Sequence, residues 1–214
     1  MEYNIQKVEE APPFSGIPEG GGWEKAEKRA LRDTVTGESP LLATHFRMLY
    51  SSEFLYTGFV VEDNAILASF TDHDYPLYRE DVVELFISPS GSLNYYYEFN
   101  FSPKEVVCDA IVLNSGGASL TGRGEVFIPL LAWDCEGLRI RAHRREDKNW
   151  SVTVQIPFSR LHLAGNRAPE PGDTWRGNLF RIEYGGTEVE YSAWSPTGMK
   201  DFHIAGTFGT FNFT

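Results

Sequence analysis

Cysteine, basic side chains and long apolar runs are what this sequence has least of. Two cysteines, Cys108 and Cys135, occur in 214 residues, so a disulfide framework does not define the fold, and their pairing stays open. No apolar run approaches the roughly 20 residues that span a bilayer. Against 30 Asp and Glu stand 19 Lys and Arg, a formal net charge of −11. Such a surface repels phosphate groups, so we expect neither nucleic acid nor a membrane as partner.

A secretion signal is also missing from the start of the sequence. Residues 1–6 contain no basic region followed by an apolar stretch. If Met1 is the native start, we expect a cytoplasmic protein; if the chain has been trimmed, a secreted or periplasmic one. The localisation therefore stays unknown, and the sequence does not specify the oligomeric state either.

Aromatic residues are abundant: 15 Phe, 10 Tyr and 5 Trp make up 14% of the chain, beside 20 Gly and 12 Pro. This combination favours β structure with frequent turns. A chain of this length can bury roughly 70% of its unfolded surface without a structural metal. We therefore predict a single domain over residues 1–214, with an irregular N-terminal segment over about 1–40 that contains Pro12, Pro13 and three consecutive glycines.

Short runs of alternating apolar and polar residues predict the strands. They cover residues 44–50, 54–62, 65–70, 82–88, 94–101, 138–143, 150–156, 175–183 and 207–213, with a brief helix over 157–163. The fold class is therefore all-β: an antiparallel β-sandwich with immunoglobulin-like or jelly-roll-like layers and minor short helices.

Alternation also assigns side chains to faces. Val83, Leu85 and Ile87 are predicted to face the core, which leaves Glu84 on the opposite side. By the same reasoning Glu98 shares the non-core face of the next strand. Because these strands are joined by a short hairpin, the two carboxylates are expected to be neighbours.

Three segments together resemble a known family. They are Leu55–Asp63, then Tyr78–Ile87 followed by Tyr-Glu-Phe-Asn at 97–100, and finally the stretch from Trp-Arg-Gly-Asn at 175–178 through Ala-Trp-Ser-Pro at 193–196 to Phe208–Gly209. Their order over residues 15–213 resembles the family 9 carbohydrate-binding modules and the stand-alone relatives of these xylanase-associated modules.

The resemblance implies non-catalytic binding of a mono- or oligosaccharide, often at the reducing end of a xylan- or glucan-type polysaccharide, between two aromatic side chains. By position, Trp194 and Tyr78 match the two aromatic residues, although many members have tryptophan where this chain has Tyr78. The positions matching polar site residues are Asn178, Arg181, Glu84 and Glu98, with Arg79 as a further candidate.

Each of these residues also has an ordinary structural interpretation. Trp194 can belong to the core, and Tyr78 can cover a sheet edge. Arg181 alternates with Phe180 and Ile182, which predicts a position off the core face, either in solvent or in contact with a ligand.

Two other functions remain as alternatives. A glycoside hydrolase of endo-xylanase type would use Glu84 and Glu98 as its carboxylate pair; in the simpler interpretation, arginine holds both. A haem-binding sandwich would need axial ligands, for which Met48, Met199 and His203 are the candidates.

No metal site is predicted firmly. Five acidic residues could supply calcium oxygens, as members of the family often hold structural calcium, but their spacing lacks the EF-hand pattern. They are Glu62, Asp63, Asp72, Asp74 and Asp81. The five histidines show no close ligand spacing, so zinc is not expected.

Overall fold

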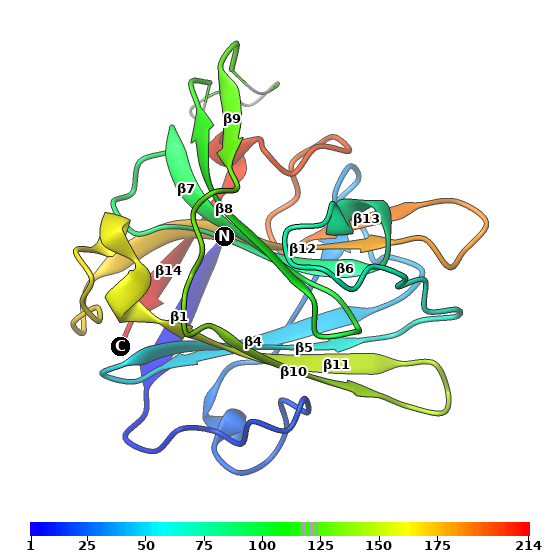
Figure 1. Ribbon diagram of the computed structural model, residues 1–214, viewed down its shortest axis with the longest axis horizontal. Helices are drawn as coiled ribbons and strands as arrows, with labels where there is room; N and C mark the ends of the chain where they lie inside the picture. The colour runs from blue at the N-terminus through cyan, green and yellow to red at the C-terminus, as the bar shows by residue number, and fades with distance from the viewer. Residues whose placement is uncertain (117–118, 120–121, 123) are drawn as a thin grey trace.

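Two β-sheets packed face to face make up the structure, a computed structural model that describes residues 1–116, 119, 122 and 124–214 (Figure 1). The first sheet runs, in spatial order, β9 (Phe127–Leu130), β8 (Val107–Asn114), β7 (Tyr95–Phe101), β6 (Val82–Ser88), β12 (Thr174–Glu183) and β14 (Gly209–Phe213), with β13 (Glu190–Ala193) also paired to β12 and β3 (Arg32–Asp33) paired to β13.

The second sheet lies below the first in Figure 1. Its spatial order is β10 (Arg139–Arg144), β11 (Trp150–Pro157), β5 (Phe54–Val61) and β4 (Thr44–Tyr50), with β2 (Arg29–Ala30) paired to β4. Strand β1 (Glu2–Lys7) connects the sheets, because its first residues pair with β14 and its last with β4. Both of these pairings are parallel, whereas the other strand pairs in the described residues are antiparallel.

The predicted β-sandwich is confirmed. Helical structure in the described residues consists of 3₁₀ turns: η1 (Trp23–Lys25), η2 (Leu77–Arg79), η3 (Phe158–Arg160), η4 (His162–Ala164) and η5 (Ala205–Thr207). The helix predicted over 157–163 is replaced by η3 and η4. No helix in the described part of the chain is long and apolar enough to cross a membrane.

Two local predictions were wrong. The segment predicted as irregular contains β1, whose short alternation buries only Tyr3 and Ile5 among exposed neighbours. Residues 65–70 form no strand, because their backbone groups bond to side chains: Leu67 N donates to the Asp81 carboxylate and Phe70 N to Glu80. Strands β8, β9 and β13 were not predicted.

The main core fills the space between the sheets, and Val83, Leu85 and Ile87 face it as predicted. The first sheet is covered on its other face as well, where a second apolar cluster includes Val82 and Phe86. This sheet is thus buried on much of both faces. Cys108 and Cys135 are buried free thiols.

Candidate functional site

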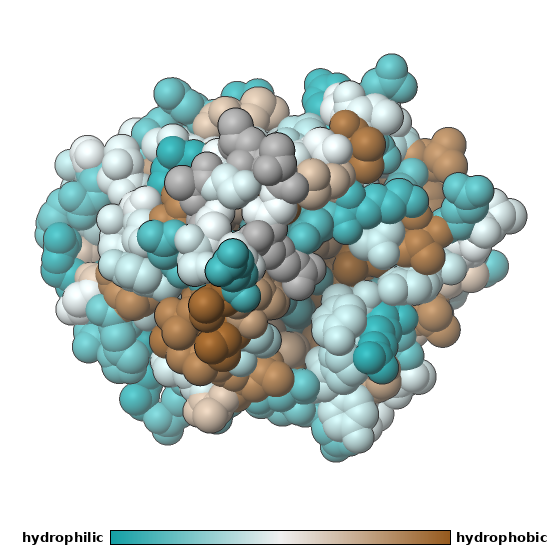
Figure 2. Space-filling model, turned by 90° about the horizontal axis from the view of Figure 1, so that it is seen from above, coloured by the Kyte–Doolittle hydropathy of each residue, from teal (hydrophilic) through white to brown (hydrophobic). Residues whose placement is uncertain are grey.

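A cleft of about 690 Å³ opens on the outer face of the first sheet. This volume is within the usual range for small-molecule sites. Figure 2 looks onto this face and shows a depression with both polar and apolar side chains around it. The sheet supplies the floor. The walls come from the segment around η2, from β9, from β13 and the chain that precedes it, and from residues 200–203.

Glu84 and Glu98 lie on the cleft floor, brought there by the pairing of β6 with β7. In that register Glu84 is opposite Asn100, and Phe86 is opposite Glu98. Burial, together with the nearby Glu98 carboxylate, raises the pKa of Glu84 well above its usual value. This shift favours the protonated form of Glu84, which can donate a hydrogen bond into the cleft.

Asn100 carries an unused acceptor at the same place. Its amide nitrogen donates to Glu98 Oε1 at 3.0 Å, while its buried carbonyl oxygen has no hydrogen-bond partner among the described residues. A buried polar atom without a partner costs free energy, on the order of 1–3 kcal/mol. A ligand that donates to this oxygen would recover that cost.

His203 enters the cleft from the segment before η5 and is held in a fixed position. Its Nδ1 is hydrogen-bonded to the Tyr96 hydroxyl at 2.8 Å, and its ring stacks on Phe86 with centroids 5.1 Å apart. Its Nε2 lies 3.9 Å from Glu98 Oε2. The imidazole edge thus faces the carboxylate pair.

Tyr78 forms an exposed part of the rim and is 49% exposed. It lies on η2, where Leu77 is inserted into the second apolar cluster and so turns Tyr78 outward. The Tyr184 hydroxyl donates to the Tyr78 carbonyl at 3.0 Å, and the Arg79 guanidinium lies 5.7 Å from the centre of the Tyr78 ring. On the same rim, the Lys200 ammonium lies 5.7 Å from the centre of the Tyr191 ring. Aromatic surface and hydrogen-bonding groups thus occur together here.

A sequence profile of the family described as "Carbohydrate-binding family 9" matches residues 24–213. The chain belongs to carbohydrate-binding family 9. The predicted family is confirmed, and with it carbohydrate binding as the function class. No curated protein sequence matches the chain.

Solved structures agree with this fold. A candidate carbohydrate-binding protein from Bacteroides uniformis has a TM-score of 0.69 at 18% identity, covering 100% of this chain and 99% of that one. A family 9 carbohydrate-binding module from Caldicellulosiruptor kristjanssonii, in complex with cellotriose, has a TM-score of 0.70 at 11% identity, covering 100% and 94%. The same organism's module in complex with glucose gives 0.69 and 11%, covering 100% and 96%.

Of the seven residues predicted for the family 9 site, the structure brings four together around the cleft. These are Tyr78, Arg79, Glu84 and Glu98. The other three, Trp194, Arg181 and Asn178, do not line it.

Trp194 belongs to the core, so the prediction that it stacks on a sugar needs correction. The side chain is 1% exposed. Its ring stacks on Phe211 with centroids 5.2 Å apart and meets Phe46 edge-on. A ring covered by protein on both sides has no face to offer a pyranose.

Arg181 and Asn178 also have structural roles. Arg181 was predicted to lie off the core face, but it is fully buried on the side that faces the second sheet, like Leu179. Phe180 and Ile182 lie on the outer face, in the second apolar cluster. Asn178 exchanges hydrogen bonds with the Ser195 backbone, donating to its oxygen at 2.8 Å and accepting from its nitrogen at 2.9 Å.

The candidates for haem ligation are separated. Met48 is buried in the main core, and neither Met48 nor Met199 is among the residues that line the cleft. His203 does line the cleft, but its ring is held by Tyr96 and Phe86. The described cleft therefore supplies no methionine–histidine pair.

The five candidate calcium ligands do not gather at one point. Asp63 and Asp81 converge with Glu183, around the Arg181 guanidinium, which pairs with Glu183 and lies 3.7 Å from Asp63 Oδ2. Asp74 belongs to a separate group with His73. Glu62 accepts a hydrogen bond from Ala43 N at 3.0 Å, and Asp72 belongs to neither group.

Several cleft residues were not predicted as saccharide-binding residues. Among them are Asn100, Tyr184, Tyr191, Lys200 and His203, of which His203 was predicted only as a candidate haem ligand. The sequence places Asn100 beside Glu98 on the same face, so Asn100 could have been predicted as a site residue from the alternation alone. The remaining four depend on the folding of distant segments over the sheet, for which the sequence carries no local signal.

Proposed function

We propose that the cleft binds one end of a neutral saccharide, with a pyranose ring stacked on Tyr78 and its hydroxyl groups bonded to the floor. The observation that carries this proposal is the unpartnered Asn100 oxygen on a cleft floor that also holds two carboxyl groups. A pyranose offers a face of C–H groups for an aromatic ring and an edge of hydroxyl donors and acceptors. Both halves of that requirement are met in this cleft.

The floor supports a division of roles among its polar groups. Asn100 Oδ1 and the Glu98 carboxylate accept hydrogen bonds from sugar hydroxyls, and Glu84, whose raised pKa favours the protonated form, donates one. Arg79 and Lys200 on the rim add donors. Because several donors and acceptors from the floor and the rim converge on one cleft, a terminal sugar, which has more free hydroxyl groups, suits it better than a sugar in the middle of a chain. We propose the reducing end of a glucan- or xylan-type oligosaccharide.

The printed ligands of the family 9 structures support a glucose-based sugar as the first choice. Family 9 module structures from Caldicellulosiruptor kristjanssonii hold cellotriose in one case and glucose in the other. Calorimetric titration with glucose, cellotriose, xylose and xylotriose, each beside its reduced alditol, tests the proposal. We expect saturable binding of the glucose-based sugars that is lost on reduction. Flat heats across the panel would contradict saccharide binding in this cleft.

Replacing Tyr78 with alanine is expected to weaken that binding. Loss of an aromatic side chain that makes a main binding contact costs about 2 kcal/mol, or roughly a 30-fold rise in Kd. The matched control is Tyr95→Ala, because Tyr95 is also exposed yet does not line the cleft. Both variants should keep the thermal stability of the parent. If Tyr78→Ala binds as tightly as Tyr95→Ala, the stacking role is wrong.

We further propose that Glu84 and Glu98 bind without catalysing hydrolysis. The family is one of binding modules, and both carboxyl groups find a use in hydrogen bonding. Incubation with cellotriose and xylotriose should release no shorter sugars, measured by chromatography over a day. Turnover that disappears in Glu84→Gln would instead establish the hydrolase alternative.

A further inference from the structure

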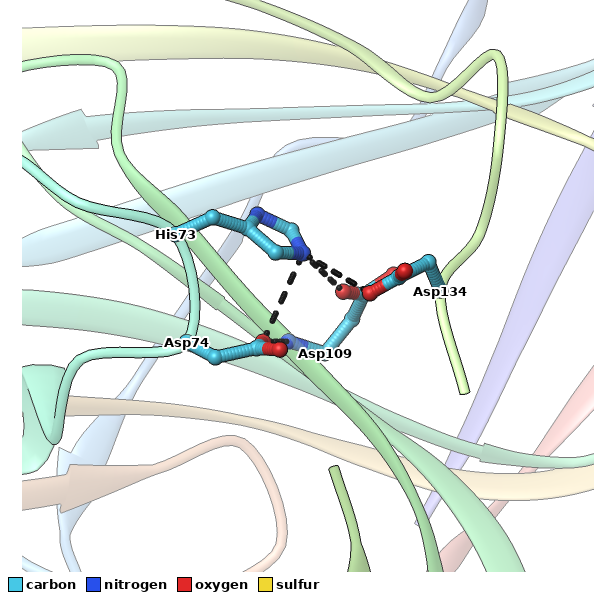
Figure 3. A group of neighbouring side chains, drawn as sticks. All are labelled: His73, Asp74, Asp109 and Asp134. Atoms are coloured by element: carbon cyan, nitrogen blue, oxygen red, sulfur yellow. Dashed lines mark hydrogen bonds and ion pairs between the residues drawn. The ribbon is translucent and has the colours of Figure 1, made fainter. Parts of the chain in front are cut away.

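One histidine and three aspartates meet at a point apart from the cleft floor (Figure 3). His73 and Asp74 come from the loop before η2, Asp109 from β8, and Asp134 from the loop that follows β9. In Figure 3 the imidazole points at all three carboxylates. Segments far apart in the sequence thus deliver four side chains of ligand type to one place.

His73 Nε2 has more close oxygen neighbours than one hydrogen bond explains. His73 Nε2 lies 3.0 Å from Asp109 Oδ1, 3.2 Å from Asp134 Oδ1 and 3.4 Å from Asp74 Oδ1. One nitrogen carries at most one proton and cannot serve three carboxylates. In a tetrahedral zinc site with bonds of about 2.1 Å, neighbouring ligand atoms are roughly 3.4 Å apart. The three separations are close to that spacing.

The burial and hydrogen bonding of the Asp109 carboxylate are an independent observation that points to a ligand. Its side chain is 1% exposed, and its Oδ1 accepts no hydrogen bond of good geometry from the described residues. The other oxygen, Oδ2, is fixed by the Cys135 backbone nitrogen at 2.7 Å. The carboxylate is therefore held with one unsatisfied oxygen directed at His73.

Backbone contacts also orient a second carboxylate. The Asp109 backbone nitrogen lies 3.3 Å from Asp74 Oδ1 and donates to it. Partners of this kind fix ligand carboxylates in known metal centres. Backbone hydrogen bonds therefore hold two of the four side chains, Asp74 and Asp109, in position.

The charge of the group favours a cation. Three carboxyl groups face one imidazole, so with all three ionised the group has an excess of at least two negative charges. A divalent cation bound to neutral imidazole reduces the net charge to −1. An ion can enter from solvent, since the side chains of Asp134 and His73 are 64% and 49% exposed.

We propose that His73 Nε2 and one oxygen each of Asp74, Asp109 and Asp134 form a site for a divalent transition metal, with Zn²⁺ as its representative. Imidazole nitrogen is a preferred ligand of zinc, whereas calcium takes six to eight oxygens. One nitrogen and three oxygens supply the four ligands of a tetrahedral zinc shell, and the three nitrogen–oxygen separations are close to the spacing in such a shell. The bound ion ties together the loop before η2, β8 and the loop after β9, so it stabilises the fold.

The test is calorimetric titration of the chelator-treated protein with Zn²⁺ alone, together with its thermal unfolding. We expect one equivalent to bind and the melting temperature to rise with Zn²⁺ concentration, as ligand binding to the folded state requires. His73→Ala should raise the Kd for Zn²⁺ by at least about 100-fold, since even outer partners of ligands are worth about 10- to 100-fold. His143→Ala, an exposed histidine on β10, is the matched control and should bind like the parent.

His73 is exposed, so its replacement is not expected to unfold the protein, and Asp134→Asn gives a second exposed variant. The proposal is overturned if the parent shows no saturable Zn²⁺ binding, or if His73→Ala binds Zn²⁺ as tightly as His143→Ala. It is also overturned if Ca²⁺ binds here more tightly than Zn²⁺ and independently of His73. Saccharide titration of the same samples tests the cleft separately, so the zinc proposal and the saccharide proposal can fail independently.

Discussion

Trp194→Ala is expected to destabilise the fold by about 3–5 kcal/mol, the usual cost of deleting a large aromatic side chain from a core. The indole follows the end of β13 and lies among rings from three strands, Tyr3 of β1, Phe46 of β4 and Phe211 of β14. These strands lie where β1 connects the two sheets. Loss of the ring thus opens a cavity at the junction of the sandwich. Urea unfolding followed by tryptophan fluorescence measures the effect.

The backbone beside this ring supports the same expectation. A Cβ atom at Gly209 would lie 2.4 Å from the Trp194 ring, so the indole fills the space where a side chain would otherwise stand. Trp194→Phe keeps part of the packing and should lose less stability than Trp194→Ala. Folded Trp194→Ala, assayed under stabilising conditions, should bind saccharide with the parent's Kd. A variant of parental stability that no longer binds sugar would instead return Trp194 to the binding site.

The wrong prediction for Trp194 has a physical cause. It is followed by Ser195 and Pro196, which mark the end of a strand, and strand ends commonly carry binding residues. The same position also suits a core residue near a sheet edge. The rings that cover Trp194 come from β1, β4 and β14, and the parallel pairing of β1 with β14, at the two ends of the chain, leaves no local pattern in the sequence.

The assignment of faces shows both the strength and the limit of alternation. In β6 and β7 it placed Glu84 and Glu98 correctly, on the face opposite Val83 and Leu85. In β12 it failed for Arg181, because apolar residues cover both faces of that strand and a charged residue was taken to mark the outer one. Where both faces are buried, the alternation of polar and apolar residues no longer identifies the core side.

The metal-ligand group illustrates the same limit over a longer range. His73 and Asp134 are separated by 61 residues, and their approach depends on the path of β7, β8 and β9. A search for closely spaced ligands, as in a helical zinc motif, does not detect such a site. The adjacent His73 and Asp74 alone are common in exposed loops.

Arg181→Met is expected to cost about 3–5 kcal/mol at pH 8, because it leaves buried carboxylates without their cation. The guanidinium pairs with Glu183 and lies 3.7 Å from Asp63. It also donates to the Thr44 hydroxyl and the Leu42 carbonyl, both at 3.2 Å. Methionine replaces the length of the side chain but none of its charge. The free energy of unfolding from urea titration measures the loss.

The cost should fall as the pH is lowered. Burial raises the pKa of Asp81 to about 6 and that of Glu183 to about 7, even with Arg181 present. A carboxyl group whose pKa is raised on folding binds protons that the unfolded chain has released, so its ionisation removes stability as the pH rises from about 4 through 7. In Arg181→Met these groups remain protonated at pH 5, and the variant should then approach the parent.

The double variant Arg181→Met/Glu183→Gln separates charge from packing. If uncompensated charge causes the loss, removing the Glu183 carboxylate should restore part of the stability at pH 8 and change little at pH 5. An equal loss at both pH values, unrelieved by Glu183→Gln, would mean that Arg181 contributes through packing and its bonds to Leu42 and Thr44 alone. In that case the stability of the fold would not depend on the charge that Arg181 brings to the Asp63–Asp81–Glu183 group.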